Sequence, residues 1–162
     1  MKKFLTACGL LAVTFAVAAA MSAAMPDYSG TWTLDKSKSK DLPPMMVSAE
    51  TLEMTVTQDK EKLTIKNSLS GDEVSYKLDG SKAKAQMGGR MPGEATIYLE
   101  QKEDGKVVLH VLRELNFQGN AVTITITESW ELMDNGKTLK AKRTVESPRG
   151  TQEMEMVYTK KV

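Results

Sequence analysis

The chain has 162 residues and a formal net charge of +1, enough for one domain with a sizeable hydrophobic core. The near-balance of charges argues against nucleic acid as a partner, because nucleic-acid-binding domains carry a clear basic surplus. A single cysteine, Cys8, and a single histidine, His110, argue against a disulfide framework, a Cys/His zinc site and a Cys–His nucleophile. We therefore expect no metal ion, no cofactor and no catalytic residue, and we rank binding above enzymatic activity.

The first 24 residues have the three parts of a secretory signal peptide. Two lysines precede an apolar stretch that ends near residue 20, and small residues follow at positions 22–24. We predict cleavage after Ala24, so that residues 1–24 are the signal peptide and residues 25–162 form the mature domain. The mature protein is then expected in the periplasm or outside the cell.

The processed chain would contain no cysteine, so packing alone would stabilise it in an oxidising compartment. Three alternatives for the N-terminal segment remain open at this point. They are cleavage after Ala20, a retained membrane anchor, and a lipid attached to Cys8.

Apolar and polar residues alternate along nearly all of the remaining chain, and turn residues recur at short intervals. This period of two is typical of strands that bury one face. It predicts about ten strands and no helix, at residues 32–34, 52–56, 63–65, 74–78, 83–87, 95–99, 107–117, 122–132, 139–145 and 154–158. Residues 88–93, with three glycines and a proline, are expected to form a loop.

Two turn motifs near the C-terminus predict how the last strands pair. Asn135-Gly136 is a strong hairpin signal, and pairing about it puts Leu132 opposite Leu139. Ser147-Pro148-Arg149-Gly150 is a second turn, and pairing about it puts Arg143 beside Met154. A slip of one residue would spoil these matches, so the two turns predict the register.

One face of the predicted meander is apolar, and the other carries Thr, Lys, Glu and Ser. An all-β, antiparallel up-and-down barrel of about eight to ten strands follows, because closure removes exposed strand edges. A transmembrane barrel would need the opposite arrangement, with apolar residues outside. An immunoglobulin-like sandwich is the alternative, but it would need long cross-connections.

The motif Gly30-Thr31-Trp32 resembles the Gly-x-Trp opening of lipocalins and fatty-acid-binding proteins. The wider pattern SGTWTLDKSKSK, WELMDNGKTLKAKR, SPRG and VYTK resembles exported bacterial lipocalin-like proteins of the calycin type. The resemblance implies a lipocalin-like barrel in which a late basic residue packs over Trp32, and Arg143 is the candidate. Fatty-acid-binding proteins would carry two helices after the first strand, whereas residues 36–49 are few and contain Pro43-Pro44.

Three charged residues occupy inward positions of otherwise apolar strands: Arg113, Glu128 and Arg143. The Asn135-Gly136 turn puts Glu128 opposite Arg143. Pairing about Gly119-Asn120, with Leu115 opposite Ile124, puts Arg113 one diagonal step from Glu128. Buried charges must be paired, so we predict an Arg–Glu–Arg cluster inside the barrel.

The cluster has one surplus positive charge, and arginine suits the binding of a carboxylate or phosphate. Loops 36–49 and 88–93 are expected to frame the mouth of the binding site. The alternative is an internal ion network that only fixes the register; use of Glu128 as a general base is the least favoured interpretation. The ligand-binding candidates are Arg113, Glu128, Arg143, Tyr76, Tyr158 and Trp32.

The sequence thus predicts an exported protein that holds a small amphipathic or anionic ligand inside a β-barrel. The alternative is a structural or protein-interaction module with a packed core and no ligand. We expect no nucleic-acid partner and no membrane span after processing. The oligomeric state is left open by the sequence.

Overall fold

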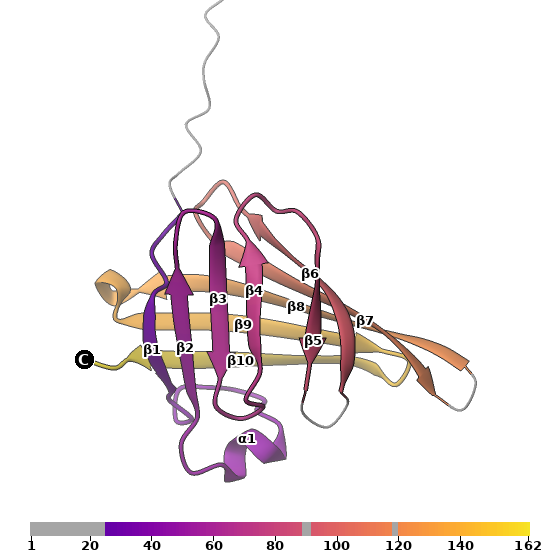
Figure 1. The fold of residues 1–162 in the computed structure, drawn as a ribbon. Coiled ribbons are helices and arrows are strands. Elements are labelled where there is room, and N and C mark those ends of the chain that lie inside the picture. Colours follow the sequence, from indigo (N-terminus) through magenta and orange to yellow (C-terminus); the bar gives the residue numbers. More distant parts are fainter. Residues whose placement is uncertain (1–24, 89–91, 118–119) are drawn as a thin grey trace, which may run out of the picture.

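The structure is a computed structural model that describes residues 25–88, 92–117 and 120–162 (Figure 1). The predicted signal peptide, and parts of the predicted turns at 88–93 and 118–121, lie outside the described residues. The strands are β1 Gly30–Leu34, β2 Glu53–Gln58, β3 Lys62–Asn67, β4 Glu73–Lys77, β5 Ala83–Met87, β6 Gly93–Gln101, β7 Val107–Phe117, β8 Asn120–Met133, β9 Thr138–Ser147 and β10 Gly150–Lys160.

The ten strands form one antiparallel sheet in the order β4-β3-β2-β1-β10-β9-β8-β7-β6-β5. Strands that pair in the sheet are also consecutive in sequence, except β1 and β10, whose pairing brings the first and last strands together. The end strands β4 and β5 face each other without a hydrogen-bonded ladder between the residues described. The predicted all-β meander is therefore confirmed as a nearly closed barrel.

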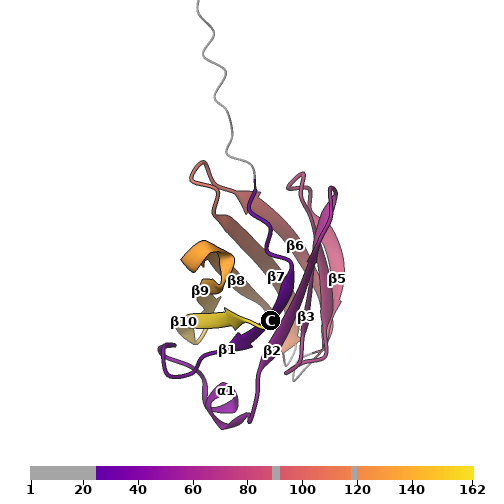
Figure 2. The ribbon, with the colours of Figure 1, turned by 90° about the vertical axis from the view of Figure 1, so that its left-hand side faces the viewer.

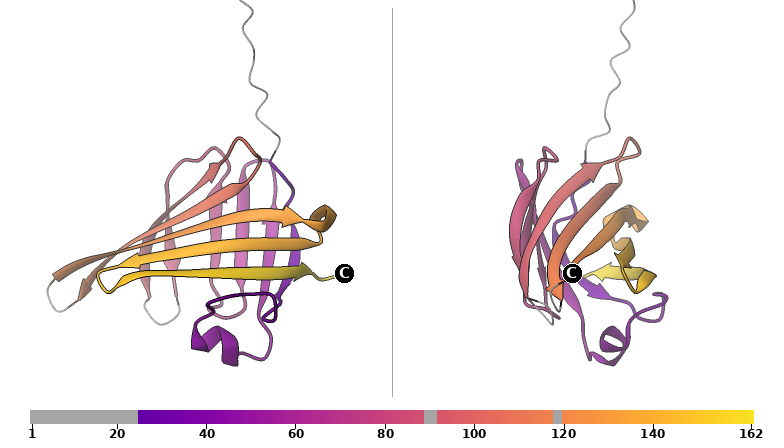
Figure 3. Two further views of the ribbon diagram at one scale, coloured as in Figure 1. Left: turned by 180° about the vertical axis from the view of Figure 1, so that it is seen from behind. Right: turned by 90° about the vertical axis from the view of Figure 1, so that its right-hand side faces the viewer.

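The barrel has two walls that cross at a steep angle. Strands β2–β5 form one wall, and the long strands β8–β10 run across it on the other side (Figures 2 and 3). The hairpin ends of β7–β8 and β9–β10 extend past the short strands at one side (Figure 3). The apolar faces of both walls point inward and bury Trp32, Trp130 and Tyr28 completely.

Both predicted C-terminal registers are confirmed. Leu132 pairs with Leu139 on β8 and β9, and Arg143 pairs with Met154 on β9 and β10. The first hairpin turns through a 3-10 segment, η1 Asp134–Gly136, in which Asn135 and Gly136 have φ values of 54° and 79°. Asparagine and glycine tolerate this left-handed backbone better than other residues, so the turn fixes the pairing.

The register predicted for β7 and β8 is wrong by two residues. Leu115 pairs with Val122 instead of Ile124, and Phe117 pairs with Asn120. A shift of two keeps every side chain on its own face, so the apolar pattern is the same in both registers. The correction moves Arg113, which now lies opposite Ile124.

The prediction of no helix is also corrected. The connection between β1 and β2 contains one short helix, α1 Pro44–Ser48, which begins after Pro43. Proline suits the first position of a helix because its missing N–H has no partner there. Met46 is buried against the core, and Lys36 Nζ donates hydrogen bonds to the carbonyl oxygens of Val47 and Ala49. No helix in the described part of the chain is long and apolar enough to cross a membrane.

Candidate functional site

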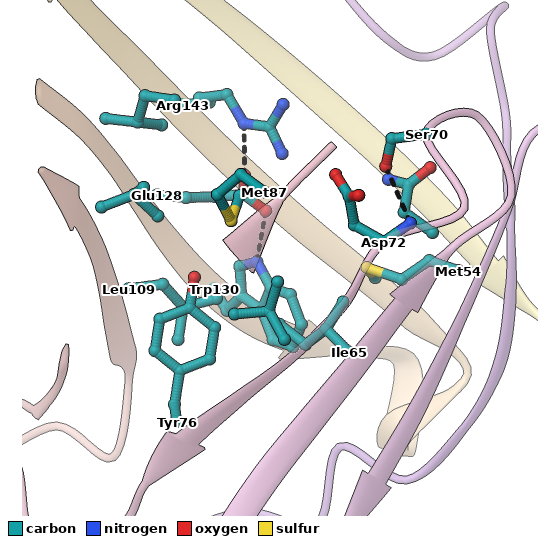
Figure 4. Close-up of a pocket in the computed structure, with 14 residues that line it drawn as sticks. Met54, Ile65, Ser70, Asp72, Tyr76, Met87, Leu109, Glu128, Trp130 and Arg143 are labelled. Atoms are coloured by element: carbon teal, nitrogen blue, oxygen red, sulfur yellow. Dashed lines mark hydrogen bonds and ion pairs between the residues drawn. The ribbon is translucent and has the colours of Figure 1, made fainter. Parts of the chain in front are cut away.

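The central pair of the site is Glu128 on β8 and Arg143 on β9, which lie directly opposite each other as predicted. Arg143 Nε donates a hydrogen bond to Glu128 Oε2, and Trp130 Nε1 donates to Glu128 Oε1 at 2.6 Å (Figure 4). The Glu128 side chain is 8% exposed and that of Arg143 is 31% exposed. Each oxygen of the buried carboxylate therefore has a donor, as a buried charge requires.

The two terminal amino groups of Arg143 are not used by this pair. Within the described chain, no residue accepts a hydrogen bond from either of them. A guanidinium has five N–H donors, so four remain available to an acceptor in the barrel. The site can therefore offer these four N–H donors to an acceptor without breaking the pairing of Arg143 with Glu128.

Two tyrosines surround the pair. Burial raises the pKa of Tyr76 and Tyr158 above the usual range; the Glu128 carboxylate raises both further, and Arg143 opposes the shift. Both phenols are thus neutral at pH 7. The hydroxyl of Tyr158 donates to Met156 Sδ at 3.4 Å, whereas Tyr76 lines the cavity described next.

A cavity of about 180 Å³ lies inside the barrel next to this pair (Figure 4). Its apolar wall comes from β2–β5, β7 and β8, and its charged lining consists of Glu128, Arg143 and Asp72. The apolar lining residues are Met54, Ile65, Val74, Met87, Leu109, Val111, Ile126 and Trp130; the uncharged polar ones are Asn67, Ser70 and Tyr76. The cavity thus combines an apolar interior with a few polar groups, as small-molecule sites do.

The rim of the cavity differs from the predicted one in the loop 36–49. No residue from 36–49 lines it, and residues 89–91 of the predicted loop 88–93 lie outside the described residues. Instead, Asn67, Ser70 and Asp72 enter from the end of β3 and the turn that follows it. The sequence marked this segment only as the connection between two predicted strands, because its approach to the cavity depends on closure of the sheet.

The predicted three-residue cluster is wrong in one member. Glu128 lies opposite Leu109 on β7. Leu109 and Arg113 are four residues apart on that strand, which at the rise of a β-strand separates them by about 13 Å. Arg113 is 8% exposed. Its guanidinium lies beside Gly93, because a Cβ added to that glycine would be 3.7 Å from Arg113 Nη2. It does not line the cavity.

The prediction that Arg143 packs over Trp32 is wrong as well. The cation over that ring is Lys160, whose Nζ lies 5.3 Å from the ring centroid. Lys160 is the direct partner of Trp32 in the β1–β10 pairing. Trp32 donates from Nε1 to the carbonyl oxygen of Tyr28 at 2.9 Å and, like Tyr158, is not among the residues lining the cavity. Both are buried core residues that do not line the cavity.

No protein-family model and no curated protein matches the sequence. Among solved structures, the chain is similar to the zebrafish ileal bile acid-binding protein complexed with cholic acid. The TM-score is 0.53 at 15% sequence identity, over 83% of this chain and 98% of the other. The likeness is one of fold. With the strand order above, it shows a nearly closed, lipocalin-like up-and-down β-barrel, in which β1 and β2 are joined by a short connection with a single helix.

Proposed function

We propose that this barrel binds a small amphipathic molecule, with its apolar part inside the cavity and its polar group at Arg143. The observation that carries the proposal is the position of Arg143. Its terminal amino groups reach a cavity with an apolar wall, and no described residue accepts hydrogen bonds from them. The bile acid-binding protein with the same fold supports the proposal, because its structure holds an amphipathic acid.

The volume of the cavity limits the size of the ligand. Sites for drug-sized molecules measure roughly 300–1,000 Å³, whereas this cavity measures about 180 Å³. A larger molecule would have to leave part of its surface outside. We therefore expect a short-chain amphipath rather than a fully enclosed lipid.

Native mass spectrometry tests the proposal on protein purified from the expression host without detergent. We expect a co-purifying small molecule that is retained by Lys142→Met and lost from Arg143→Met. Lys142 is the matched control because it is the next residue of β9 and is exposed on the outer face. A bare protein that also fails to bind short-chain amphipaths at millimolar concentration would overturn the proposal and favour the packed-core module.

The same spectrum tests export, which we propose from residues 1–24. Processing after Ala24 would give a mature chain that begins at Met25. The expected mass is that of residues 25–162. A mass that includes the first 24 residues, or an added lipid at Cys8, would contradict cleavage at this position.

A further inference from the structure

We infer that the occupant of the cavity is a zwitterion whose anionic group meets Arg143 and whose ammonium group meets Asp72. This inference rests on the proposed function and narrows its ligand class. Asp72 and Arg143 come from different sides of the barrel: Asp72 directly precedes β4, and Arg143 lies in the middle of β9. In Figure 4 their charged groups extend toward each other from opposite sides of the cavity.

Asp72 has one oxygen in use and one available. Its Oδ1 accepts a hydrogen bond at 2.8 Å from the backbone N–H of Gly88, which follows β5. In the described residues, no Lys, Arg or His lies within ion-pair distance of Asp72, and Oδ2 accepts no hydrogen bond. The contact with Gly88 thus holds the carboxylate at the cavity while Oδ2 is left for a ligand.

The charges of the lining disfavour a simple anion. The pairing of Glu128 with Arg143 is formally neutral, so the third charged residue, Asp72, makes the lining negative overall. A carboxylate ligand would gain hydrogen bonds from Arg143 but would also approach a second, unpaired carboxylate. Like charges placed together reduce affinity, whereas an ammonium group on the same ligand would pair with Asp72.

A matched series of probes with one chain length tests this inference by isothermal titration calorimetry at pH 7. The probes are 2-aminooctanoic acid, octanoic acid and octylamine. We expect the amino acid to bind about tenfold more tightly than octanoate, the effect of one charge-assisted hydrogen bond. Asp72→Asn should bring the two affinities to within about threefold, because the amide still accepts from Gly88 but carries no charge.

Glu73→Gln is the control, since it removes a carboxylate from the next residue, which is exposed and does not line the cavity. The tenfold preference should survive this substitution. If octanoate binds as tightly as the amino acid, or if Asp72→Asn keeps the preference, the zwitterion inference is overturned and the proposed function stands. If none of the three probes binds, the proposed function fails and the inference fails with it.

Discussion

Glu128 and Arg143 are direct cross-strand partners, and the carboxylate of Glu128 accepts hydrogen bonds from both Arg143 and Trp130. The pair is buried at one end, where Glu128 lies, and half-exposed at the other. This geometry lets the pair stabilise the fold and, in the proposed function, bind a ligand as well. Arg143 neutralises the glutamate through Nε and presents its terminal amino groups to the cavity.

Removal of one member of the pair should destabilise the fold. Arg143→Met leaves the Glu128 carboxylate buried with the Trp130 indole as its remaining donor, so we expect the free energy of unfolding to fall by about 3 kcal/mol. The double variant Glu128→Met/Arg143→Met should recover most of this loss, because no buried charge remains. Urea unfolding of the single and double variants measures both effects. A loss below about 1 kcal/mol for Arg143→Met would show that solvent already screens the pair.

Gly30 and Lys160 are predicted to constrain each other where the barrel closes. Gly30 has a φ of 140°, and a Cβ added there would lie 2.5 Å from Lys160 Cε. We expect Gly30→Ala to destabilise the protein by about 1–3 kcal/mol, through backbone strain and this overlap. Thermal unfolding of Gly30→Ala and of Gly30→Ala/Lys160→Ala separates the two causes. The effect of Lys160→Ala alone is subtracted first. The double variant should then regain only the part of the stability loss that comes from the overlap, while the part from backbone strain should remain.

The sequence predicts the strands well because their signal is local. Alternation of apolar and polar residues marks each strand, and the turn chemistry of Asn135-Gly136 fixes the pairing that joins Glu128 to Arg143. The β7–β8 pairing was less determined, because a shift of two residues leaves the inward face unchanged. That ambiguity alone displaced Arg113 from the predicted cluster.

The position of Asp72 could not be predicted from the sequence for a different reason. Asp72 and Arg143 line the same cavity although their strands are far apart in the sheet order, so their approach depends on the closure of the whole sheet. A turn residue with a short polar side chain has an ordinary local explanation, so nothing near it in the sequence indicates a binding role. The same holds for Lys160, which meets Trp32 only through the β1–β10 pairing.

Lys36 is predicted to hold the β1–β2 connection in place. Its Nζ donates to carbonyl oxygens at the end of α1, where helix carbonyls lack partners within the helix. Lys36→Met should increase amide hydrogen exchange across residues 44–50 while leaving the melting temperature nearly unchanged, since the barrel strands keep their ladders. Lys38→Met is the control, because Lys38 is exposed and its ion-pair partner among the described residues is Asp35, at 3.2 Å. Equal exchange in both variants would contradict an anchoring role for Lys36.

The buried tyrosines predict a loss of stability at alkaline pH. Burial raises the pKa of Tyr28 to about 12 and shifts the pKa of Tyr76 and Tyr158 in the same direction. In the unfolded chain these phenols ionise near pH 10, so above that pH the unfolded state holds fewer protons than the folded state. The stabilising contribution is therefore complete below pH 10 and is lost as the pH rises toward 12.

Urea unfolding at pH 9, 10 and 11 measures this dependence. We expect the free energy of unfolding to decrease with pH in this range, and to decrease less steeply in Tyr158→Phe, which removes one buried ionisable phenol. Tyr98→Phe is the control, because that ring stacks on His110 at 4.3 Å on the outer face. If Tyr158→Phe and the unsubstituted protein lose stability with the same slope, the alkaline effect comes from lysine deprotonation and not from the phenols beside Glu128.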